Sequence, residues 1–358
     1  MNVLYGVVGE GMGHAMRSRV LLEHLLSQGH QVQVMASGRA HGYLAKRFDG
    51  VNQIHGLHLI VEENRVRLGR TIWSNVLSGL AGIPKNIAAY FDLIRDFRPT
   101  LVVSDFESWT YLYGKMHGLP VLSVDNQQFI ARCRHPDEII AGHESSFQLT
   151  KTFVKSKLPY CAHYMVTTFV RPEVRKPDTT LYPPILRPEI LNTKTTRGEH
   201  LLVYQTQEGN TALADTLKRT KLPCRIYGMK RNIESDEKDG NLIYRPFSEL
   251  TFIEDLASCK AVIANAGFTL MGECVYMKKP MLAVALEDQF EQIINARYLH
   301  YAGYGQCAAS LLDPAQVADF VQAIPSCEAK LATYSQDGNR GLLRGLDGFL
   351  DRAEAGVL

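Results

Sequence analysis

The residues best suited to chemistry form two groups, one at the start of the chain and one in its second half. In the first group Gly9, Gly11, Gly13 and His14 directly follow an apolar run over residues 3–8. The glycines allow a tight turn that brings the histidine to the first turn of a helix. There the helix dipole disfavours the imidazolium, so the ring suits a general base. The alternative for one of twelve histidines is a solvated or capping role.

In the second group an apolar run over residues 261–264 ends at Asn265, Ala266 and Gly267, where a helical pattern begins. A strand that turns through a glycine into a helix leaves backbone N–H groups beside the positive end of the helix dipole. Such a turn binds anions with backbone alone, and the next strand ends in polar residues 287–289 at the same sheet edge. Both features predict a phosphate-bearing ligand. The alternative is an ordinary strand–helix–strand unit in which the glycine serves packing.

Two more strands of the first half end in polar side chains. Asp105 ends the apolar run 101–104, and it can hydrogen-bond the second ring nitrogen of His14, which would fix the tautomer and stabilise the imidazolium. The alternative is an N-cap for the following helix. Residues 125–127 (Asp, Asn, Gln) follow the run 120–124. Their polar groups can either bind the second substrate of a reaction, its acceptor, or cap a helix.

Strands and helices alternate along the chain, which predicts an α/β fold with parallel sheets. A dinucleotide site is excluded, because His14 stands where a Gly or Ala is needed and Ser37 stands where an acidic residue is expected. The expected strands span 3–8, 31–36, 51–57, 101–105, 120–124, 162–170 (the last of the first half), 201–204, 224–227, 242–245, 261–264 and 281–286. The expected helices span 15–28, 41–48, 72–97 with a break at 82–84, 211–218, a segment from 249, 317–324 and 341–352.

A length of 358 residues predicts about two domains, and the densest proline region, 171–188, marks the linker. We expect an N-terminal domain over 1–175, a linker over 176–198, a C-terminal domain over 199–334 and a closing helix over 335–358.

Composition bounds the class of protein. Apolar residues make up 46% and charged residues 21%, which is typical of a globular protein with an ample core. A net charge of +2 without a Lys/Arg run argues against a nucleic-acid partner. The seven scattered cysteines predict buried thiols in a reducing cytoplasm. The chain starts directly on a strand and has no long apolar segment, so we expect neither a signal peptide nor a transmembrane helix.

The second group resembles the donor-binding signature of GT-B glycosyltransferases when it is extended to Glu273, Pro280, Asp288, Gln289 and Asn295. It is similar to the motif of the UDP-glycosyltransferases and of the lipid II N-acetylglucosaminyltransferase. The Gly-x-Gly-His motif resembles the N-terminal motif of inverting members. The resemblance implies two Rossmann-like, doubly wound domains that face each other across a cleft, with a last helix that returns to the N-terminal domain.

It also implies site residues. His14 would be the base and Asp105 its partner, and Glu273 would accept hydrogen bonds from the ribose. Asp288 and Gln289 would bind the sugar, with Gln292 as a second candidate. The implied donor-binding set is Gly11, Gly13, Gln205, Thr206, Gly209, Phe247 (against the nucleobase, or alternatively in a core), Asn265, Ala266, Gly267, Phe268, Thr269, Glu273, Asp288, Gln289 and Gln292.

Metal use and stereochemistry follow from two absences. No Asp-x-Asp occurs to hold a cation against the diphosphate, so we expect no metal and no cofactor. Asn265 stands where retaining members have Glu, so inversion is favoured.

The expected reaction moves a hexose or N-acetylhexosamine from a nucleoside diphosphate sugar, with UDP preferred, to a hydroxyl acceptor in a glycan, glycolipid or small glycoside. One alternative is a nucleotide-sugar 2-epimerase, although the Arg-Pro-Glu turn of that family is absent after the first strand. The other is a non-catalytic nucleotide-sugar-binding protein. We expect a cytoplasmic protein, at the inner face of the membrane if the acceptor is lipid-linked.

Overall fold

The computed structural model describes residues 1–9, 11–54, 85–205, 211–230, 232–286 and 289–358, with side chains in the helix over 85–97 described from residue 91. The chain forms two compact units. Unit 1 comprises Met1–His135, Gly142–Ile185 and Asn339–Leu358, and unit 2 comprises Pro136–Ala141 and Leu186–Gly338.

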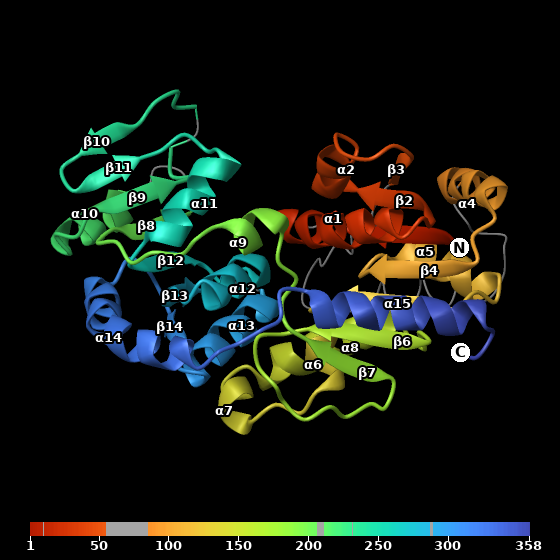
Figure 1. Cartoon of the computed structure of the whole chain (residues 1–358). Coiled ribbons are helices and arrows are strands. Elements are labelled where there is room, and N and C mark those ends of the chain that lie inside the picture. The colour runs from red at the N-terminus through yellow and green to blue at the C-terminus, as the bar shows by residue number, and fades with distance from the viewer. Residues whose placement is uncertain (10, 55–84, 206–210, 231, 287–288) are drawn as a thin grey trace. The chain divides into compact units, whose positions relative to one another are not determined.

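Unit 1 is built on a seven-stranded parallel sheet with the order β3-β2-β1-β4-β5-β6-β7 (Figure 1). The order reverses between β1 and β4. Strands β4 and β5 are buried at every position, as expected where helices cover both faces of a sheet. The strands are β1 (Asn2–Val7), β2 (Gln31–Ser37), β3 (Val51–Ile54), β4 (Leu101–Asp105), β5 (Val121–Asp125), β6 (His163–Thr167) and β7 (Thr179–Tyr182).

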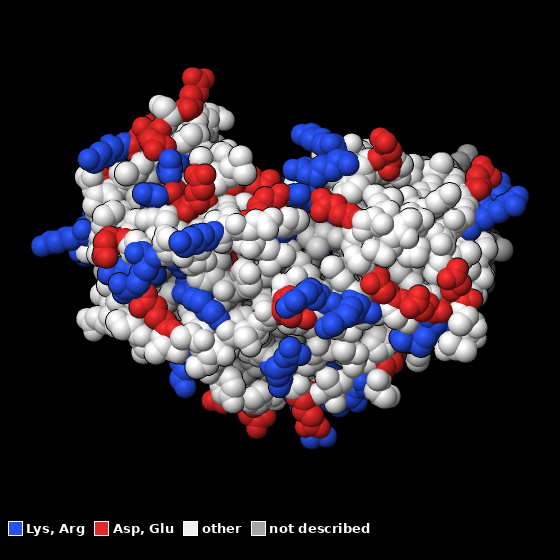
Figure 2. Space-filling view, in the orientation of Figure 1, with Lys and Arg blue, Asp and Glu red and all other residues white. Residues whose placement is uncertain are grey.

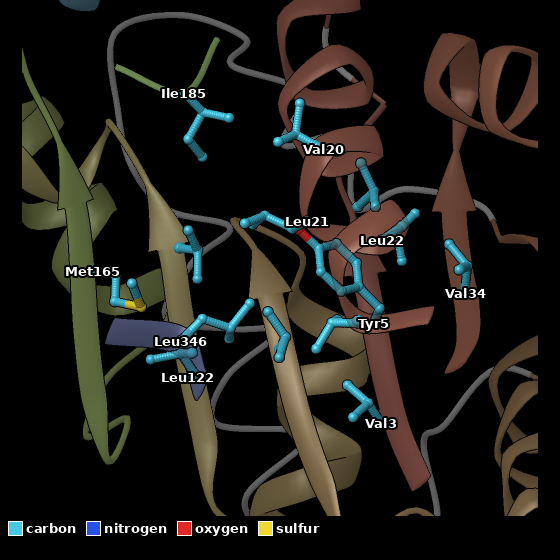
Figure 3. Packing of buried hydrophobic residues seen from close by; sticks show 14 of the residues in the cluster. Val3, Tyr5, Val20, Leu21, Leu22, Val34, Leu122, Met165, Ile185 and Leu346 are labelled. Carbon is cyan, nitrogen blue, oxygen red and sulfur yellow. The ribbon is translucent and has the colours of Figure 1, made fainter. Parts of the chain in front are cut away.

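The last helix of the chain belongs to unit 1. Leu342, Leu346 and Phe349 of this helix lie in the same hydrophobic cluster as Tyr5 and Leu122, and Figure 3 shows Leu346 beside Leu122. The helices of unit 1 are α1 (Met12–Ser27), α2 (Gly38–Leu44), α4 (Lys85–Phe97), α5 (Ser108–Met116), α6 (Gln128–Arg132), α8 (Glu144–Lys157) and α15 (Arg340–Glu354).

Unit 2 repeats this architecture with the order β10-β11-β9-β8-β12-β13-β14, which reverses between β8 and β12. All neighbours are parallel except the edge pair β10 and β11. The strands are β8 (Leu201–Tyr204), β9 (Cys224–Tyr227), β10 (Glu237–Asp239), β11 (Leu242–Tyr244), β12 (Ala261–Asn265), β13 (Met281–Val284) and β14 (Gly305–Ala308). The helices are α7 (Asp137–Ile140), α9 (Pro188–Asn192), α10 (Thr211–Arg219), α11 (Glu249–Ser258), α12 (Phe268–Tyr276), α13 (Phe290–Tyr301) and α14 (Pro314–Ala332).

A short segment from the first half of the chain is part of unit 2. Helix α7 packs on α13, where Ile139 is buried. Arg297 of α13 donates Nη1–H groups to the carbonyl oxygens of Ile139, at 3.0 Å, and Ala141, at 2.7 Å. These bonds satisfy carbonyls that the end of α7 leaves open.

The α/β prediction with parallel sheets is confirmed, and three local expectations are corrected. The strand near 162–170 is not the last of the first half, because β7 follows it inside the proline-rich stretch. Its residues Thr-Thr-Leu-Tyr favour strands, and the prolines only flank it. The first helix begins at Met12 rather than residue 15, and α2 ends at Leu44 rather than residue 48. The expected strand beyond residue 54 and helix before residue 85 lie outside the described residues.

On the face seen in Figure 2, basic and acidic side chains of each unit lie interspersed. All seven cysteines are free, and Cys307 alone among them is exposed. Over the described residues, no helix is long and apolar enough to cross a membrane.

Candidate functional site

Both predicted groups of residues lie where the strand order of a sheet reverses. In unit 1, β1 leads into α1, which carries His14, and Val7 of β1 pairs with Asp105 at the end of β4. In unit 2, β12 leads through Asn265 into α12, and β12 pairs with β8 on the other side of the reversal. Ligands of open α/β sheets bind at such reversals, at the carboxyl ends of the strands.

The glycines of the first turn have separate reasons to be glycine. Gly11, the N-cap of α1, has a φ of 85°, which a residue with a Cβ adopts at a cost. Gly9 lies against the backbone after β2, where an added Cβ would come within 2.5 Å of the carbonyl carbon of Ser37. Gly13 lies in the first turn of α1 itself. His14 also lies in this first turn, as predicted, and is 7% exposed.

The structure brings His14 and Asp105 together, although 91 residues separate them. His14 Nδ1 lies 2.8 Å from Asp105 Oδ1, and Asp105 is fully buried. The alternative role for Asp105, a helix N-cap, is wrong. Glu107 caps α5 instead, since its carboxylate accepts hydrogen bonds from the backbone N–H groups of Trp109 and Thr110.

The charge state of Asp105 determines the tautomer of His14. Burial disfavours the carboxylate, but Arg17 and His14 outweigh burial and lower the pKa of Asp105 to about 2. Arg17 Nε and Ser18 Oγ both donate to Oδ2, at 2.8 and 3.0 Å. An ionised carboxylate only accepts hydrogen bonds, so Nδ1 of His14 is the donor. In the neutral ring the lone pair is therefore on Nε2.

Residues after β5 complete the surroundings of His14. Gln127 is the N-cap residue of α6, but Asp125 Oδ1 accepts from the backbone N–H of Gln128 at 2.7 Å, so its carboxylate binds the start of this helix, which is in line with the capping interpretation. Asn126 Oδ1 accepts from Arg17 Nη1. Gln127 Nε2 lies 3.2 Å from His14 Nε2, and we assign it as the donor to the ring lone pair. A side-chain amide thus occupies the hydrogen-bonding position at Nε2 of His14.

In unit 2 the turn that was predicted to bind an anion leads directly into the N-terminus of α12. Gly267 is the N-cap of α12, and no side chain caps this end. The first helical hydrogen bond runs from Met271 N–H to Gly267 O, so the N–H groups of Thr269 and Leu270 have no acceptor within the helix. A Cβ added at Gly267 would meet no atom of the described residues within 4 Å. The turn therefore presents its backbone to open space.

Two polar side chains, Gln205 and Asn295, lie next to this turn. Because Tyr204 pairs with Ala264, Gln205 follows β8 directly beside Asn265. Gln205 is 7% exposed, and its Nε2 has no hydrogen-bond partner among the described residues. Asn295 of α13 donates to the carbonyl of Ala266 at 3.3 Å and so holds the turn from behind. The candidates Thr206 and Gly209 lie outside the described residues.

Glu273 of α12 is buried and bound to an arginine that the sequence patterns did not single out. Arg187 donates Nε–H and Nη2–H to its two oxygens at 2.8 and 3.1 Å, and Nη1–H to Glu249 at 2.6 Å. Burial raises the pKa of Glu273, and Arg187 opposes that rise. Proline residues around Arg187 suggested a linker and concealed this contact.

The remaining donor candidates are close to solvent. Gln289, the N-cap of α13, accepts from Gln292 Nε2 at 2.6 Å, and Gln292 Oε1 accepts from the backbone N–H of Leu286. Asp288 lies outside the described residues. The described part of the chain holds no group of three His, Cys, Asp or Glu side chains that could ligate a metal.

Phe247 follows β11 and is 63% exposed, so it does not lie in a core. Its ring contacts those of Tyr204, Tyr227 and Phe252, with centroids 6.1 to 6.4 Å apart. The aromatic neighbours fix one side of the ring and leave much of it accessible. Such a ring can stack on a planar ligand.

Comparison with known proteins gives consistent matches over most of the chain. The family described as "Glycosyl transferase family 1" matches residues 1–325. An uncharacterised glycosyltransferase of Methanosarcina acetivorans is 23% identical over 92% of this chain and 91% of its own length. A UDP-N-acetylglucosamine–N-acetylmuramyl-(pentapeptide) pyrophosphoryl-undecaprenol N-acetylglucosamine transferase of Bacillus thuringiensis is 24% identical, with the same coverage.

Solved structures share the fold at low identity. The spinosyn rhamnosyltransferase SpnG has a TM-score of 0.64 and 18% identity, over 97% of this chain and all of its own. The calicheamicin glycosyltransferase CalG4 has a TM-score of 0.64 and 14% identity, over 98% of both chains. These likenesses show the GT-B fold.

Proposed function

The chain belongs to glycosyl transferase family 1 and is a glycosyltransferase of GT-B fold, and from this premise we propose its reaction. It moves a hexose or N-acetylhexosamine from a nucleoside diphosphate sugar, with UDP as the preferred nucleotide, to a hydroxyl acceptor. The transfer inverts the anomeric centre and needs no metal. Family membership favours this over a 2-epimerase or a non-catalytic binding protein.

We assign the donor to unit 2. The uncapped N-terminus of α12 offers backbone N–H groups to a diphosphate, and the adjacent Gln205 has a buried amide N–H group without a described acceptor. Phe247 is placed to stack on the nucleobase. Glu273 is the expected ribose ligand, and in that role it would bind the hydroxyls while its carboxylate stays paired with Arg187.

We assign the base to His14 of unit 1, and the His14–Asp105 hydrogen bond is the observation that carries the proposal. His14 Nε2 removes the proton of the acceptor hydroxyl as its oxygen bonds to the anomeric carbon. The bond from that carbon to the diphosphate breaks, and the diphosphate leaves with the electron pair. Asp105 stabilises the imidazolium through Nδ1. A positioned base of this kind contributes roughly 10²–10⁴-fold.

The acceptor must displace one side chain. Gln127 Nε2 now contacts His14 Nε2, so the acceptor hydroxyl takes the place of this amide. The undecaprenol-linked substrate named for the relative in Bacillus thuringiensis makes a lipid-linked hydroxyl one acceptor class to test. Such an acceptor would bring the protein to a membrane surface.

The test begins with the donor. A thermal-shift panel of UDP, dTDP and GDP, each free and as its sugar, identifies the nucleotide. Transfer is then followed as release of that nucleoside diphosphate in the presence of lipid-linked and small-molecule alcohols. His14→Ala is expected to lower transfer at least 100-fold while UDP binding is unchanged.

His41→Ala is the matched control, because His41 is a half-buried histidine of α2 in the same unit. We expect it to leave both UDP binding and transfer unchanged. Transfer that persists in His14→Ala would disprove the assignment of the base. A stabilising response to none of the nucleotides would disprove the donor assignment.

A further inference from the structure

Arg17 is a second functional candidate on α1, one helical turn beyond His14. Residues three apart on a helix lie on the same face, and both side chains point into unit 1, with Arg17 5% exposed. A buried cation is costly unless it is paired and hydrogen-bonded. The partners of Arg17 therefore indicate why an arginine is present.

The guanidinium joins two strand ends. It donates from Nε and Nη2 to the two oxygens of Asp105 at the end of β4, and from Nη1 to Asn126 Oδ1 in the turn after β5. Nη2 also lies 3.4 Å from Gln127 Oε1. This forked geometry is specific to arginine, because a lysine offers one point charge. One side chain thus orients both the carboxylate and the amide that contact His14.

The same guanidinium touches the ring of His14. Arg17 Nη2 lies 2.7 Å from Nδ1, the nitrogen that donates to Asp105. Neither atom can accept a hydrogen bond from the other, so both protons are directed to Asp105 Oδ1. A positive charge at this distance opposes a second positive charge on the imidazole, while Asp105 favours it.

We propose that Arg17 is a positioning residue of the transfer reaction. It fixes the Asp105 carboxylate and the Asn126–Gln127 turn around His14, and it places a positive charge 2.7 Å from the ring nitrogen that faces Asp105. The inference rests on the proposed role of His14.

Other ionisable groups near this cluster do not replace Arg17. Tyr5 of β1 interacts with Asp105 and Arg17, and burial raises its pKa, so the phenol stays uncharged. Asp125 of β5 is also buried, and burial raises its pKa. The described groups that face His14 from β1, β4 and β5 are thus neutral or acidic. Arg17 supplies the positive charge.

The test measures the protonation of His14 directly, without a substrate. Protein with isotope-labelled histidine is titrated by NMR of the imidazole nitrogens, and the His14→Ala spectrum assigns the signal. In the wild type we expect the proton of the neutral ring on Nδ1, the nitrogen that faces Asp105. Arg17→Met removes the charge, so the imidazolium should persist to a pH about 1–2 units higher.

Matched variants separate charge from shape. Arg17→Lys keeps the charge and should titrate near the wild type, although the loss of the fork should lower kcat. Arg19→Met removes an arginine that pairs with Glu23 on the outer side of α1 and should change nothing. Arg17→Gln, which keeps a donor without the charge, replaces the methionine variant if thermal unfolding shows that Arg17→Met does not fold.

The outcomes distinguish the two proposals. An Arg17→Met or Arg17→Gln protein whose His14 titrates at the wild-type pH overturns the inference about Arg17, even when His14→Ala abolishes transfer. Transfer that survives His14→Ala overturns the proposed base, whatever the titration shows. Once a donor and an acceptor are identified, kcat can be measured as a function of pH. The acid limb of this profile should lie about 1–2 pH units higher in Arg17→Met than in the wild type.

Discussion

Replacing Asp105 with asparagine tests whether its carboxylate is ionised in the folded protein. The pKa of Asp105 is lowered from 3.8 to about 2, with Arg17 and His14 outweighing the opposite effect of burial. At about 1.4 kcal/mol per pH unit, this difference stabilises the folded state by about 2 kcal/mol. Because the pKa is lowered on folding, the stabilisation is complete above pH 3.8 and disappears as the pH falls through 2.

The variant Asp105→Asn removes this contribution and leaves Arg17 with a buried charge that lacks its carboxylate. We expect the free energy of unfolding to fall by about 3 kcal/mol at pH 7, since breaking one side of a buried pair costs about 3–5 kcal/mol and Asn126 still binds Arg17. The difference from the wild type should shrink to about 1 kcal/mol at pH 2.

Urea unfolding followed by tryptophan fluorescence is the assay. Trp109 of α5 is buried in unit 1, so its fluorescence reports on that unit. Asp92→Asn is the matched control, because Asp92 pairs with Arg95 at the exposed surface of α4 and should cost less than about 0.5 kcal/mol. A difference between Asp105→Asn and the wild type that stays constant from pH 7 to pH 2 would refute an ionised, paired Asp105.

Two further predictions concern an exposed and a buried side chain. Phe247→Ala should weaken UDP binding about tenfold and leave the unfolding midpoint of unit 2 nearly unchanged, because the ring is 63% exposed. Calorimetric titration with UDP checks this, with the exposed Leu250→Ala as control; unchanged affinity would contradict stacking. Leu346→Ala should lower the stability of unit 1 by about 2–5 kcal/mol, because its side chain is fully buried. Tryptophan-detected unfolding measures the loss, with the exposed Arg344→Ala as control. A cost below 1 kcal/mol would show that α15 contributes little to that core.

Local features of the site were predictable from the sequence because they depend on short-range physics. The turn before His14 requires glycine where φ is positive, and Gly11 supplies it. The turn at Asn265–Gly267 follows from an apolar run that meets a helical pattern. Alternating strands and helices then predicted two parallel sheets.

Long-range contacts could not be predicted in this way. Asp105 meets His14 because β1 and β4 are neighbours at the reversal of strand order, and no local pattern specifies that order. The helix N-cap interpretation of Asp105 was equally compatible with the sequence. Arg187 meets Glu273 across 86 residues, from a stretch that looked like a linker.

Arg17 shows the division between sequence and structure within one helix. Its position three residues after His14 was visible in the sequence, and that spacing places both on one face of α1. Whether this face is buried or solvated depends on which strands lie beneath it. The tertiary structure brings the ends of β4 and β5 under α1. Arg17 is therefore buried and contacts Asp105, Asn126 and His14, which the sequence alone could not predict.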